Sequence, residues 1–585
     1  MRSRSARGWQ FVLLATCMSA AATAFVTGVG ARSTPPAPST RIGRRVGEVS
    51  TAVKLEAFQG YLATTESMTM IISFEPRDQA GLQKLIADLY SPSSPNYRNW
   101  LTPAEFGERF GRTPEEFNHA LDWLQGQGFV IESAFANRLD ISFSGTVDSV
   151  QRAFNVQMGR YWDSVNSRSF FSNMQLPTLP PELDAITEGL EGLSNATLYH
   201  THTRAFPGPY TQQPAGTPSP SNRARPSGLP GDPDFMAPAD LAVAYDFAPL
   251  NAGGIQGQGQ KIGIIIDSDV KNKDVTLYRT LFGLPPADIV RTVPRGLFSP
   301  GVQSSGQLEA TLDVASVSIP APMAEIDIVL IPELSFADTR MAEQFVVNQD
   351  ELHVVNESFG ACEQDGFALA EQSTYNQALV EGIAFFVATG DEGAECGNNF
   401  PGVRQIECPA CYGGVTAVGG TQIQATFNQT TGALISVQSE DVWNSPPGDL
   451  LNCAGTEATF PAGATGGGIS QIVDIPTYQA LAQGFPNCAP PSSNRIVPDI
   501  SALAGEPFTV AYLNGKVFFF IGTSEASPMW AGMITLVNQL NGTPIGSPNP
   551  LLYRLAITQY ATASLPGSFH DITVGNNTVL PRQPC

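Results

Sequence analysis

Hydrophobic positions in residues 45–200 alternate between strand-like and helical spacing, which predicts a small α+β domain. Residues 68–74 and 139–144 are short apolar runs rich in branched and aromatic side chains, as is typical of strands. Apolar residues at helical spacing fill three further segments, at 80–90, 114–125 and 147–154. We expect these strands and helices to pack together as a small sandwich.

From about residue 236 the pattern changes to buried strands that alternate with helices. The predicted strands are 261–266, 325–331, 353–357 and 384–388, and the predicted helices between them are 306–318, 344–349 and 375–382. Such alternation is typical of parallel βαβ units, whose functional residues gather at the carboxyl ends of the strands. The second part of the chain is therefore predicted to be an α/β domain with a mainly parallel sheet.

Residues 204–235 separate the two patterns and form a predicted linker. Pro, Gly, Ser and Gln crowd the stretch 206–234, so we expect it to be extended, exposed and open to cleavage. This divides the chain into a domain at 45–203, the linker, and a domain at 236–585. A length of 585 residues agrees with two or three domains.

The first 31 residues have the features of a secretory signal peptide. Three arginines among the first seven residues precede an apolar stretch, and the small residues at 29–31 fit a cleavage site. We expect residues 1–31 to be removed and the protein to be secreted. The alternatives are an uncleaved anchor and a lipid-modified Cys17. No later segment reaches the roughly 18 uninterrupted apolar residues of a membrane span, so we expect no stable membrane span.

The composition excludes one class of partner. The chain has 32 Lys and Arg against 54 Asp and Glu, with a net charge of −22 at pH 7. Binding of nucleic acid needs clusters of Lys and Arg that neutralise phosphates, and the sequence contains no such cluster. We therefore expect no nucleic acid partner, and we expect a monomer. An excess of carboxylates is also compatible with work at acid pH, where protonation reduces their mutual repulsion.

The cysteines agree with export. Of the 8 cysteines, Cys17 would leave with the signal peptide, and the others lie in the C-terminal half. Three disulfides and one odd thiol are expected, with the connectivity open. Cys408 and Cys411 have the spacing of a metal or redox pair, but without a second such pair or a nearby His we favour a structural disulfide.

Residues 522–528 (GTSEASP) hold the strongest candidate for a nucleophile. They follow a β-rich apolar run at 517–521 and precede a helical pattern. A turn of small residues between a strand and a helix exposes a hydroxyl at the helix N-terminus, where free N–H groups and the helix dipole favour negative charge. Ser524 is therefore a candidate nucleophile, although Thr523, Ser524 and Ser527 could instead cap the helix.

Three acidic residues could act with such a serine. Glu309 and Asp313 lie four residues apart in a helical pattern, so their carboxylates share one face and cannot both ionise easily. Asp391 follows the predicted strand 384–388, within the sequence TGDEGA. A solvated acidic helix face would also explain the first two residues, and a turn would explain Asp391.

Taken together, these motifs resemble the active-site motifs of the sedolisin family of serine-carboxyl peptidases. The matching segments are Glu309-x-x-x-Asp313, TGDEGA at 389–394 and GTSEASP at 522–528, in the family's order and approximate spacing. Supporting segments are AVGGT at 417–421, GGGIS at 466–470 and VPDIS at 497–501. Residues 97–106 (YRNWLTPAEF) resemble the family's activation prodomain, and the likeness covers nearly everything after residue 45.

The resemblance implies a role for each candidate residue. Ser524 would be the nucleophile, Glu309 its general base, Asp313 the residue that orients Glu309, and Asp391 the stabiliser of the oxyanion. The chemistry agrees with these roles. A carboxylate base with a pKa near 4.3 suits acid conditions, in which a His would be protonated. A carboxyl group can donate a hydrogen bond to an oxyanion only when it is protonated, as Asp391 would be in acid.

The resemblance also implies the fold and its regulation. Residues 236–585 would form a doubly wound, mainly parallel sheet with helices on both faces, as in subtilisin, and would cut polypeptide substrates. Residues 45–203 would be a kumamolisin-type prodomain that covers the cleft as an intramolecular inhibitor until the linker is cut. Protonation of carboxylates at the prodomain interface is the hypothesised trigger. Endopeptidase and tripeptidyl-peptidase activity both stay open.

Calcium is the ion that the resemblance implies, and the match to its site is partial. Asp571 and Ile572 match the first half of the family's site, in which an Asp side chain and the next carbonyl bind the ion. A later Gly-x-Gly-x-Asp segment, the second half, does not occur before Cys585, whereas calcium needs about six to eight oxygens. A calcium site at Asp571 and Ile572 is thus an expectation, and the alternative is that Asp571 only closes a turn.

Two other functions fit parts of the sequence. A subtilisin-type Ser-His-Asp peptidase shares the GTS-x-x-SP segment, and Asp267 ends an early predicted strand. However, neither His353, which we place in a strand, nor His570 has the context of a catalytic His, and Glu309 stands where that His is expected. The second alternative is a secreted, non-catalytic binding protein on a peptidase scaffold. It is disfavoured because no active-site residue is missing.

Overall fold

The computed structural model describes residues 57–164, 166–207, 235–363, 370–396, 403–428, 433–445, 463–485, 490–561 and 567–578. The predicted signal peptide at 1–31, most of the predicted linker, and Cys453, Cys488 and Cys585 lie outside the described residues.

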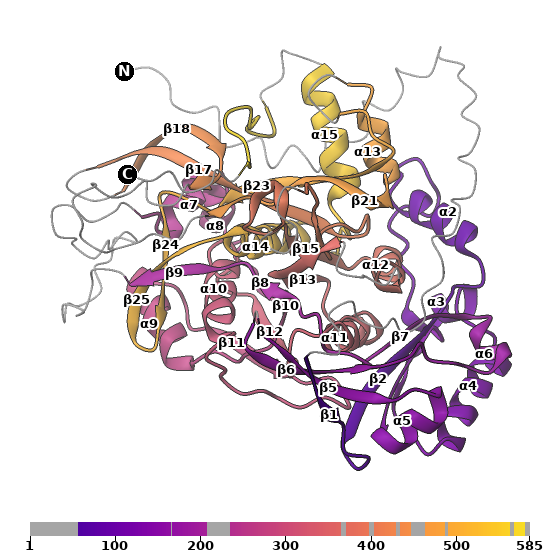
Figure 1. The fold of residues 1–585 in the computed structure, drawn as a ribbon. Helices are drawn as coiled ribbons and strands as arrows, with labels where there is room; N and C mark the ends of the chain where they lie inside the picture. The colour runs from indigo at the N-terminus through magenta and orange to yellow at the C-terminus, as the bar shows by residue number, and fades with distance from the viewer. Residues whose placement is uncertain are drawn as a thin grey trace, which may run out of the picture.

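The first part of the chain forms two antiparallel sheets with helices, at the lower right of Figure 1. The larger sheet has the order β3-β4-β2-β7, and the smaller has the order β1-β5-β6. The strands are β1 (Phe58–Tyr61), β2 (Ser67–Phe74), β3 (Val130–Ala134), β4 (Asp140–Thr146), β5 (Met158–Asp163), β6 (Arg168–Asn173) and β7 (Thr187–Glu191). The helices are α2 (Gln79–Leu89), α3 (Pro103–Arg109), α4 (Pro114–Gly126), α5 (Val147–Phe154) and α6 (Pro181–Asp184). The predicted strands and helices of this part agree with these bounds within about two residues.

Local sequence signals start two helices of this N-terminal domain. The hydroxyls of Thr102 and Thr113 accept hydrogen bonds from the backbone N–H groups of Glu105 and Glu116, and those glutamates accept from the threonine N–H groups in return. Proline at the first helical position suits both helices, because that position needs no N–H donor. The apolar faces of α2, α4 and α5 then share one core with β2 and β4.

A mainly parallel sheet forms the centre of the second part. Its order is β11-β12-β10-β13-β15-β17-β18, and β23 also pairs with β17. Every pair is parallel except β17 with β18. The strands are β10 (Lys261–Ile266), β11 (Asp288–Thr292), β12 (Glu325–Leu330), β13 (Val354–Glu357), β15 (Ala384–Ala388), β17 (Thr416–Phe427), β18 (Leu434–Val442) and β23 (Ile500–Leu503). Because the chain builds outward on both sides of β10, the predicted doubly wound α/β class is confirmed.

Helices cover both faces of this sheet. Alternate strand residues enter two cores: Ile264 and Ile266 join Met529 of α14 on one face, and Ile265 joins Val346 of α11 on the other. The helices of this part are α7 (Pro238–Ala244), α8 (Ala248–Ala252), α9 (Asn272–Phe282), α10 (Gln307–Val317), α11 (Phe336–Gln349), α12 (Ala370–Glu381), α13 (Thr477–Ala482), α14 (Thr523–Asn541) and α15 (Asn549–Ala561).

Shorter strands line the edges of the domain. They are β14 (Phe359–Cys362), β16 (Glu407–Cys408), β19 (Asn444–Ser445), β20 (Gly463–Ala464), β21 (Gly468–Asp474), β22 (Asn494–Val497), β24 (Thr509–Leu513) and β25 (Lys516–Ile521). Two strands from the end of the N-terminal domain, β8 (His200–Thr201) and β9 (Arg204–Pro207), pair with β14 and β25. Residues 204–207 of the predicted linker therefore form a strand, instead of an exposed coil.

One predicted helix is longer in the structure than in the sequence pattern. The apolar spacing predicts a helix at 344–349, but α11 begins at Phe336. Its first half buries Thr339, Arg340 and Glu343 at 0% exposure. Buried polar side chains hide the apolar periodicity on which the prediction depends.

Buried polar contacts join the N-terminal domain to the second domain. Arg340 Nη2 of α11 lies 3.1 Å from Asp140 Oδ1 of β4, and the two side chains are 0% and 1% exposed. Asn137 donates to the side chains of Gln344 and Gln377 at 3.0 and 2.8 Å. Because each of these groups is buried, separating the domains would leave several polar atoms without partners until water reaches them.

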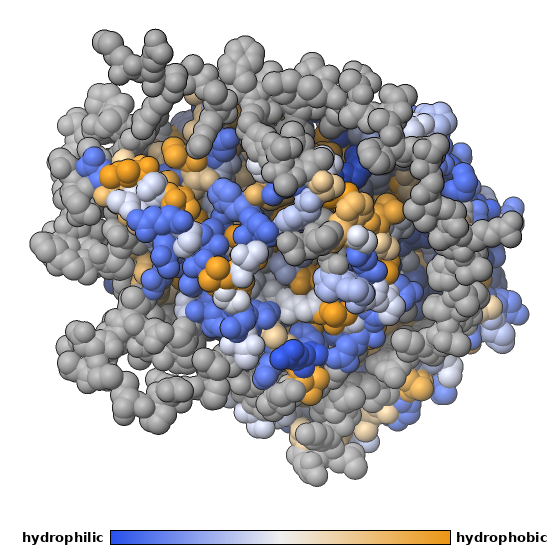
Figure 2. All heavy atoms as spheres, turned by 90° about the horizontal axis from the view of Figure 1, so that it is seen from above, coloured by the Kyte–Doolittle hydropathy of each residue, from blue (hydrophilic) through white to orange (hydrophobic). Residues whose placement is uncertain are grey.

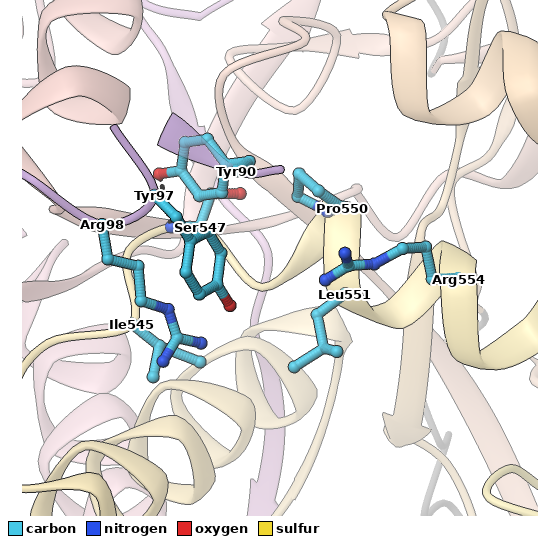
Figure 3. A pocket seen from close by; sticks show the side chains of 8 residues that line it. All are labelled: Tyr90, Tyr97, Arg98, Ile545, Ser547, Pro550, Leu551 and Arg554. Atoms are coloured by element: carbon cyan, nitrogen blue, oxygen red, sulfur yellow. Dashed lines mark hydrogen bonds between the residues drawn. The ribbon is translucent and has the colours of Figure 1, made fainter. Parts of the chain in front are cut away.

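A cavity lies in another part of the same interface. The Tyr90 hydroxyl donates to the Leu379 carbonyl and accepts from the Ser547 N–H, both at 3.0 Å. Beside it lies a small cavity, and Figure 3 shows Arg98 and Arg554 on two sides of it. None of the predicted site residues lines this cavity.

Surface apolar residues are dispersed on the face shown in Figure 2. Hydrophobic residues there form small groups among hydrophilic ones. Two of the most exposed large apolar side chains are Phe298, in the loop between β11 and α10, and Leu481, in α13. Within the part of the chain that the structure describes, no helix is both long enough and apolar enough to cross a membrane.

We expect Asp140→Ala to weaken the docking of the two domains by about 3–5 kcal/mol, because it leaves the Arg340 charge buried without its partner. The measurement is the urea midpoint of the uncleaved full-length chain, followed by tryptophan fluorescence. Asp148→Ala is the matched control, since its pair with Arg152 is exposed. Equal midpoints for the two variants would show that the buried pair does not hold the domains together.

Candidate active site

Ser524 is the second residue of α14 and lies at the turn after β25. Gly522 in this turn has a φ of 140°, and a Cβ there would lie 2.1 Å from the His202 carbonyl oxygen and 2.7 Å from Asp391 Oδ2. The turn therefore requires glycine. Ser524 is 0% exposed, its Oγ has no hydrogen-bond partner among the described residues, and no side chain caps the helix. The capping alternative thus finds no support, and an unpaired buried hydroxyl needs another explanation.

Glu309 and Asp313 lie one turn apart on α10, which packs against α14. They are 1% and 0% exposed, so they do not form a solvated acidic face. Thr203 Oγ1 donates to Glu309 Oε1 at 2.8 Å, and Ser358 Oγ donates to Asp313 Oδ1 at 2.7 Å. The second oxygen of each carboxyl group has no hydrogen bond in the described part of the chain.

Burial dominates the protonation of this acid pair. It raises the pKa of Glu309 well above its usual range, and the charge of Asp313 raises it further. The hydroxyls of Ser524 and Thr203 lower the pKa of Glu309, although Ser524 Oγ forms no hydrogen bond of normal geometry. Burial likewise raises the pKa of Asp313, and the hydrogen bond from Ser358 opposes this effect. The pair therefore holds at least one proton in the described state.

Asp391 lies just beyond β15, on the other side of the Gly522 turn. Its Oδ1 accepts hydrogen bonds from the N–H and the hydroxyl of Thr523, at 2.8 and 3.0 Å. Its Oδ2 has no hydrogen bond within the described residues and lies against Gly522. Burial raises the pKa of Asp391 to about 7, and the charge of Arg204 acts against this. Asp391 is therefore a neutral hydrogen-bond donor below about pH 7.

A chain of hydrogen bonds behind the acid pair was not predicted. Ser527 Oγ donates to Asn356 Oδ1, and Asn356 Nδ2 donates to Ser358 Oγ, which in turn donates to Asp313. The side chains of all three are 0% exposed. The position of Asn356 and Ser358 at the carboxyl end of the predicted strand 353–357 was the signal that could have indicated these two residues. Ser527 lies within the candidate segment 522–528.

Residues 200–207 cross the site as an extended strand, shown in magenta in Figure 1. β8 pairs antiparallel with β14, and β9 pairs antiparallel with β25. Thr203, between these strands, reaches Glu309. Sequence reasoning did not identify Thr203, because its role depends on pairing with distant strands.

Neither histidine that a Ser-His-Asp peptidase would need takes part in this site. His353 precedes the amino end of β13, so it does not lie within the strand as predicted, and it lies 3.9 Å from Asp350. His570 Nδ1 lies 2.7 Å from Glu440 Oε2 of β18. Asp267, the candidate Asp of that alternative, follows β10 and packs closely against Gly306. A Cβ added to Gly306 would lie 2.3 Å from Asp267 Oδ1.

The described residues around Asp571 and Ile572 do not fit a calcium ion. Asp571 is exposed, and its Oδ1 accepts a hydrogen bond from the Tyr560 hydroxyl at 2.7 Å. Among the described residues, no cluster of three possible His, Cys, Asp or Glu ligands includes Asp571. One carboxylate and one carbonyl fall far short of the six to eight oxygens that calcium needs, so no step of the chemistry is assigned to this ion.

Two disulfides lie in the described residues. Cys408 pairs with Cys411, so the predicted disulfide between these two cysteines is confirmed. Cys362 pairs with Cys396 and so ties β14 to the segment that follows Asp391. The second bond restrains the wall of the site next to β8.

Comparisons with known proteins agree with this arrangement. Residues 56–196 match the family described as Pro-kumamolisin, activation domain, and residues 305–569 match the subtilase family. Sedolisin from Pseudomonas sp. is 27% identical over 88% of this chain and 83% of its own length. Kumamolisin from Bacillus sp. is 27% identical over 84% of this chain and 82% of its own length. The chain is thus similar to proteins of the sedolisin family over most of its length.

These similarities identify the chain as a serine-type peptidase, and the match to an activation domain indicates a zymogen. Tripeptidyl-peptidase 1 from Canis lupus familiaris is a further relative, 22% identical over 85% of this chain and 84% of its own length. The matched segments include the N-terminal domain and the helices that carry Glu309 and Ser524.

We expect Ser358→Ala to raise the pKa of Asp313 further, because it removes the hydrogen bond that stabilises the ionised carboxylate. The carboxyl stretching band, followed by infrared spectroscopy across a pH titration, measures this change. Ser373→Ala, which removes a hydroxyl from a different buried carboxyl group, is the control. An unchanged titration of the acid pair in Ser358→Ala would contradict the assigned contact.

Proposed function

We propose that this chain is a secreted serine-carboxyl peptidase that acts in acid and is activated from its zymogen. In this proposal Ser524 is the nucleophile, Glu309 is its general base, Asp313 orients Glu309, and Asp391 stabilises the oxyanion. The observation that carries the proposal is the buried acid pair beside the unpaired Ser524 hydroxyl, with neutral Asp391 across the Gly522 turn.

The proposed reaction is acyl transfer through an ester. Glu309 takes the proton of Ser524 Oγ as that oxygen attacks the carbonyl carbon of the substrate, and the carbonyl electron pair moves to its oxygen. Glu309 then gives the proton to the amide nitrogen as the C–N bond breaks and the amine leaves. Water repeats the sequence on the ester and restores Ser524. Asp313 lies one turn from Glu309 on the same face of α10, and in this proposal it orients the Glu309 carboxyl group.

Neutral Asp391 would donate to the oxyanion. In the described state burial raises the pKa of Asp391 to about 7. Departure of the strand at 200–207 admits water to Asp391, so the donor is lost as the pH rises through a value below about 7. Glu309 must be ionised to accept a proton. In the described state Thr203 covers it, and departure of the strand admits water, which lowers its pKa toward the usual range. The two requirements together favour an acid optimum.

Polypeptide substrate would bind as a strand in the place of residues 200–207. β14 and β25 offer backbone groups that β8 and β9 satisfy in the described state. The prodomain segment is thus an intramolecular inhibitor that occupies the substrate site. The proposal includes both endopeptidase and tripeptidyl-peptidase activity.

The proposal also keeps the division of the chain into a signal peptide at 1–31, a prodomain at 45–203, a cleavable linker at 204–235 and a peptidase domain at 236–585. Secretion is supported by the two disulfides, which form in oxidising compartments. We propose that the mature enzyme works as a monomer without nucleic acid. Calcium is left out of the mechanism, because the described residues at Asp571 do not fit it.

We expect Ser524→Ala and Glu309→Gln to lower kcat/KM on an unfolded protein by at least about 10⁴-fold and 10²-fold, because they remove the nucleophile and the base. Both effects are measured with acid-treated enzyme from acid to mildly alkaline pH. Activity that peaks near neutrality in the unaltered chain, or that survives in Ser524→Ala, would contradict the proposed mechanism.

Asp391 allows a sharper test of the pH profile. Asp391→Asn keeps a donor that does not titrate, so the alkaline limb, expected below about pH 7, should move to higher pH. Asp391→Ala should cost about 10²–10³-fold in kcat. Asp338→Asn is the matched control, since burial raises the pKa of Asp338 also to about 7, but α11 lies on the other face of the sheet. If Asp391→Asn leaves the limb in place, Asp391 is not the donor.

The hypothesised trigger is that protonation of carboxylates at the prodomain interface releases the prodomain in acid. The carboxyl groups of β7 at this interface would have the opposite effect. Burial raises the pKa of Glu188 to about 7 and that of Glu191 to about 8. In the free domain both groups would ionise near their usual value of about 4.3. The stabilisation of docking by Glu188 and Glu191 is therefore complete below about pH 4, where both groups are neutral, and it is lost as the pH rises toward 7–8. Acid strengthens this part of the interface, which supports release by cleavage instead of by protonation.

In the uncleaved Ser524→Ala chain, we expect docking stability to fall as the pH rises from about 5 to about 8, and to fall less in Glu188→Gln/Glu191→Gln. The measurement is the thermal midpoint at each pH. Glu182→Gln, an exposed glutamate on α6, is the control. A double variant that follows the same curve as its parent would rule out these two groups.

A further inference from the structure

Two histidines and a glutamate meet where the prodomain strand crosses the peptidase domain. His200 lies in β8, His202 follows it, and Glu407 lies in β16, on the opposite side of β14. One ligand atom from each residue lies within 4.8 Å of the other two. His202 and Glu407 are buried, at 1% and 4% side-chain exposure, whereas His200 is half exposed. The mechanism proposed above uses none of these side chains.

The distances agree with ligands around one small ion. His202 Nε2 lies 3.1 Å from Glu407 Oε2, and His200 Nε2 lies 3.6 Å from Glu407 Oε1. Zinc binds nitrogen and oxygen ligands tetrahedrally at about 2.0–2.2 Å, which places two ligand atoms about 3.4 Å apart. The three side chains therefore need only small movements to bind one ion.

Two neighbouring side-chain atoms of this cluster, His202 Nε2 and Glu407 Oε2, have lone pairs that no hydrogen bond in the described part of the chain uses. Neither His202 Nε2 nor Glu407 Oε2 has a hydrogen-bond partner within the described residues, although they lie close together. The His202 ring also makes a hydrogen bond with the backbone of Phe359. Because Nε2 makes none, this bond uses Nδ1, and it fixes the ring with Nε2 free. A backbone partner on the far nitrogen is the usual support of a metal-binding His.

Two glycines leave the space that such a site needs. A Cβ on Gly360 would lie 2.7 Å from Glu407 Oε2 and 2.9 Å from His202 Nε2. A Cβ on Gly390 would lie 2.6 Å from Glu407 Oε1. Backbone thus surrounds the buried ligands, while the exposed side of His200 leaves room for water as a fourth ligand.

We propose that His200, His202 and Glu407 form a site for a divalent transition metal of the kind that prefers imidazole, such as Zn²⁺. Two ligands come from the prodomain strand and one from the peptidase domain, so the site exists only while residues 200–202 occupy the cleft. The ion fastens the inhibitory strand across the active site. This consequence for activation rests on the proposed function, whereas the binding of the metal does not.

Metal binding is tested with the full-length Ser524→Ala chain, which keeps the strand in place. Calorimetric titration with ZnCl₂ at pH 7 should give one ion per chain. His202→Gln and His200→Gln should each weaken binding by about 10–100-fold. His119→Gln, an exposed histidine on α4, is the matched control and should bind as the parent does. Absence of saturable binding in the parent, or binding in the His200 and His202 variants as tight as in the parent, would overturn the site.

Cobalt provides a second readout that does not depend on the buried His202 variant folding. Co²⁺ bound by two imidazoles and a carboxylate should give visible absorption bands of a four-coordinate ion, and Zn²⁺ should displace them. His200→Gln changes a half-exposed side chain and should lower or shift these bands. Bands identical in the parent and in His200→Gln would contradict the ligand set.

The role in activation is tested separately with the active chain. Zn²⁺ should slow the loss of the prodomain at the highest pH at which the unaltered chain still matures, and Glu407→Gln should remove this effect. If Zn²⁺ binds to the Ser524→Ala chain but the unaltered chain shows no peptidase activity, the proposed function fails and the metal site stands. If the chain is active and Zn²⁺ does not slow maturation, the fastening role is wrong.

Discussion

The burial of two carboxyl groups on one turn of α10 is the constraint on which the rest of the site depends. Because both side chains are buried away from water, Glu309 and Asp313 cannot both be charged, and the pair holds a proton. Hydroxyl groups that donate hydrogen bonds stabilise the remaining negative charge. The peptidase domain supplies Ser358 at the end of β13, and the prodomain supplies Thr203. The sheet, helix α14 and the prodomain strand are therefore all positioned around this one pair.

The strand at 200–207 connects the two domains in the way that a substrate would. Its backbone satisfies β14 and β25, whose edges would otherwise be open to another strand. Its carbonyl at His202 packs against Gly522, where any side chain would collide. In the proposed function, inhibition and substrate binding depend on the same backbone groups, so release of the strand would open the site to its substrate without a change of fold.

Buried acids are not confined to the active site. The Tyr375 hydroxyl lies 3.0 Å from a carboxyl oxygen of Glu343 and 3.0 Å from one of Glu357, and burial raises the pKa of both carboxyl groups. Such groups lose little stability in acid, because they are already neutral in the folded state. A chain with few basic residues can therefore stay folded at low pH, where ordinary ion pairs would fail.

The sequence by itself determined the class of fold and the identity of the candidate chemistry. Strand β15 and helix α10 were predicted within one residue, because β15 is a short continuous apolar run and α10 has apolar residues at helical spacing. The motifs around Ser524, Glu309 and Asp391 indicated the family. Helix α11 was predicted only in its second half, because buried Arg340 and Glu343 interrupt its pattern. Strands as short as β8 and β16 carry no period of their own, so only their partners define them.

Only the tertiary structure decided how these residues act on one another. It brought Thr203 to Glu309 across 106 positions of the chain, and Ser358 to Asp313 across 45. It also buried the acid pair, which sequence spacing could equally have placed in water. Local pattern specifies which side chains share a face, whereas burial and partner choice arise from contacts between segments far apart in the chain, and these two factors set every pKa on which the chemistry depends.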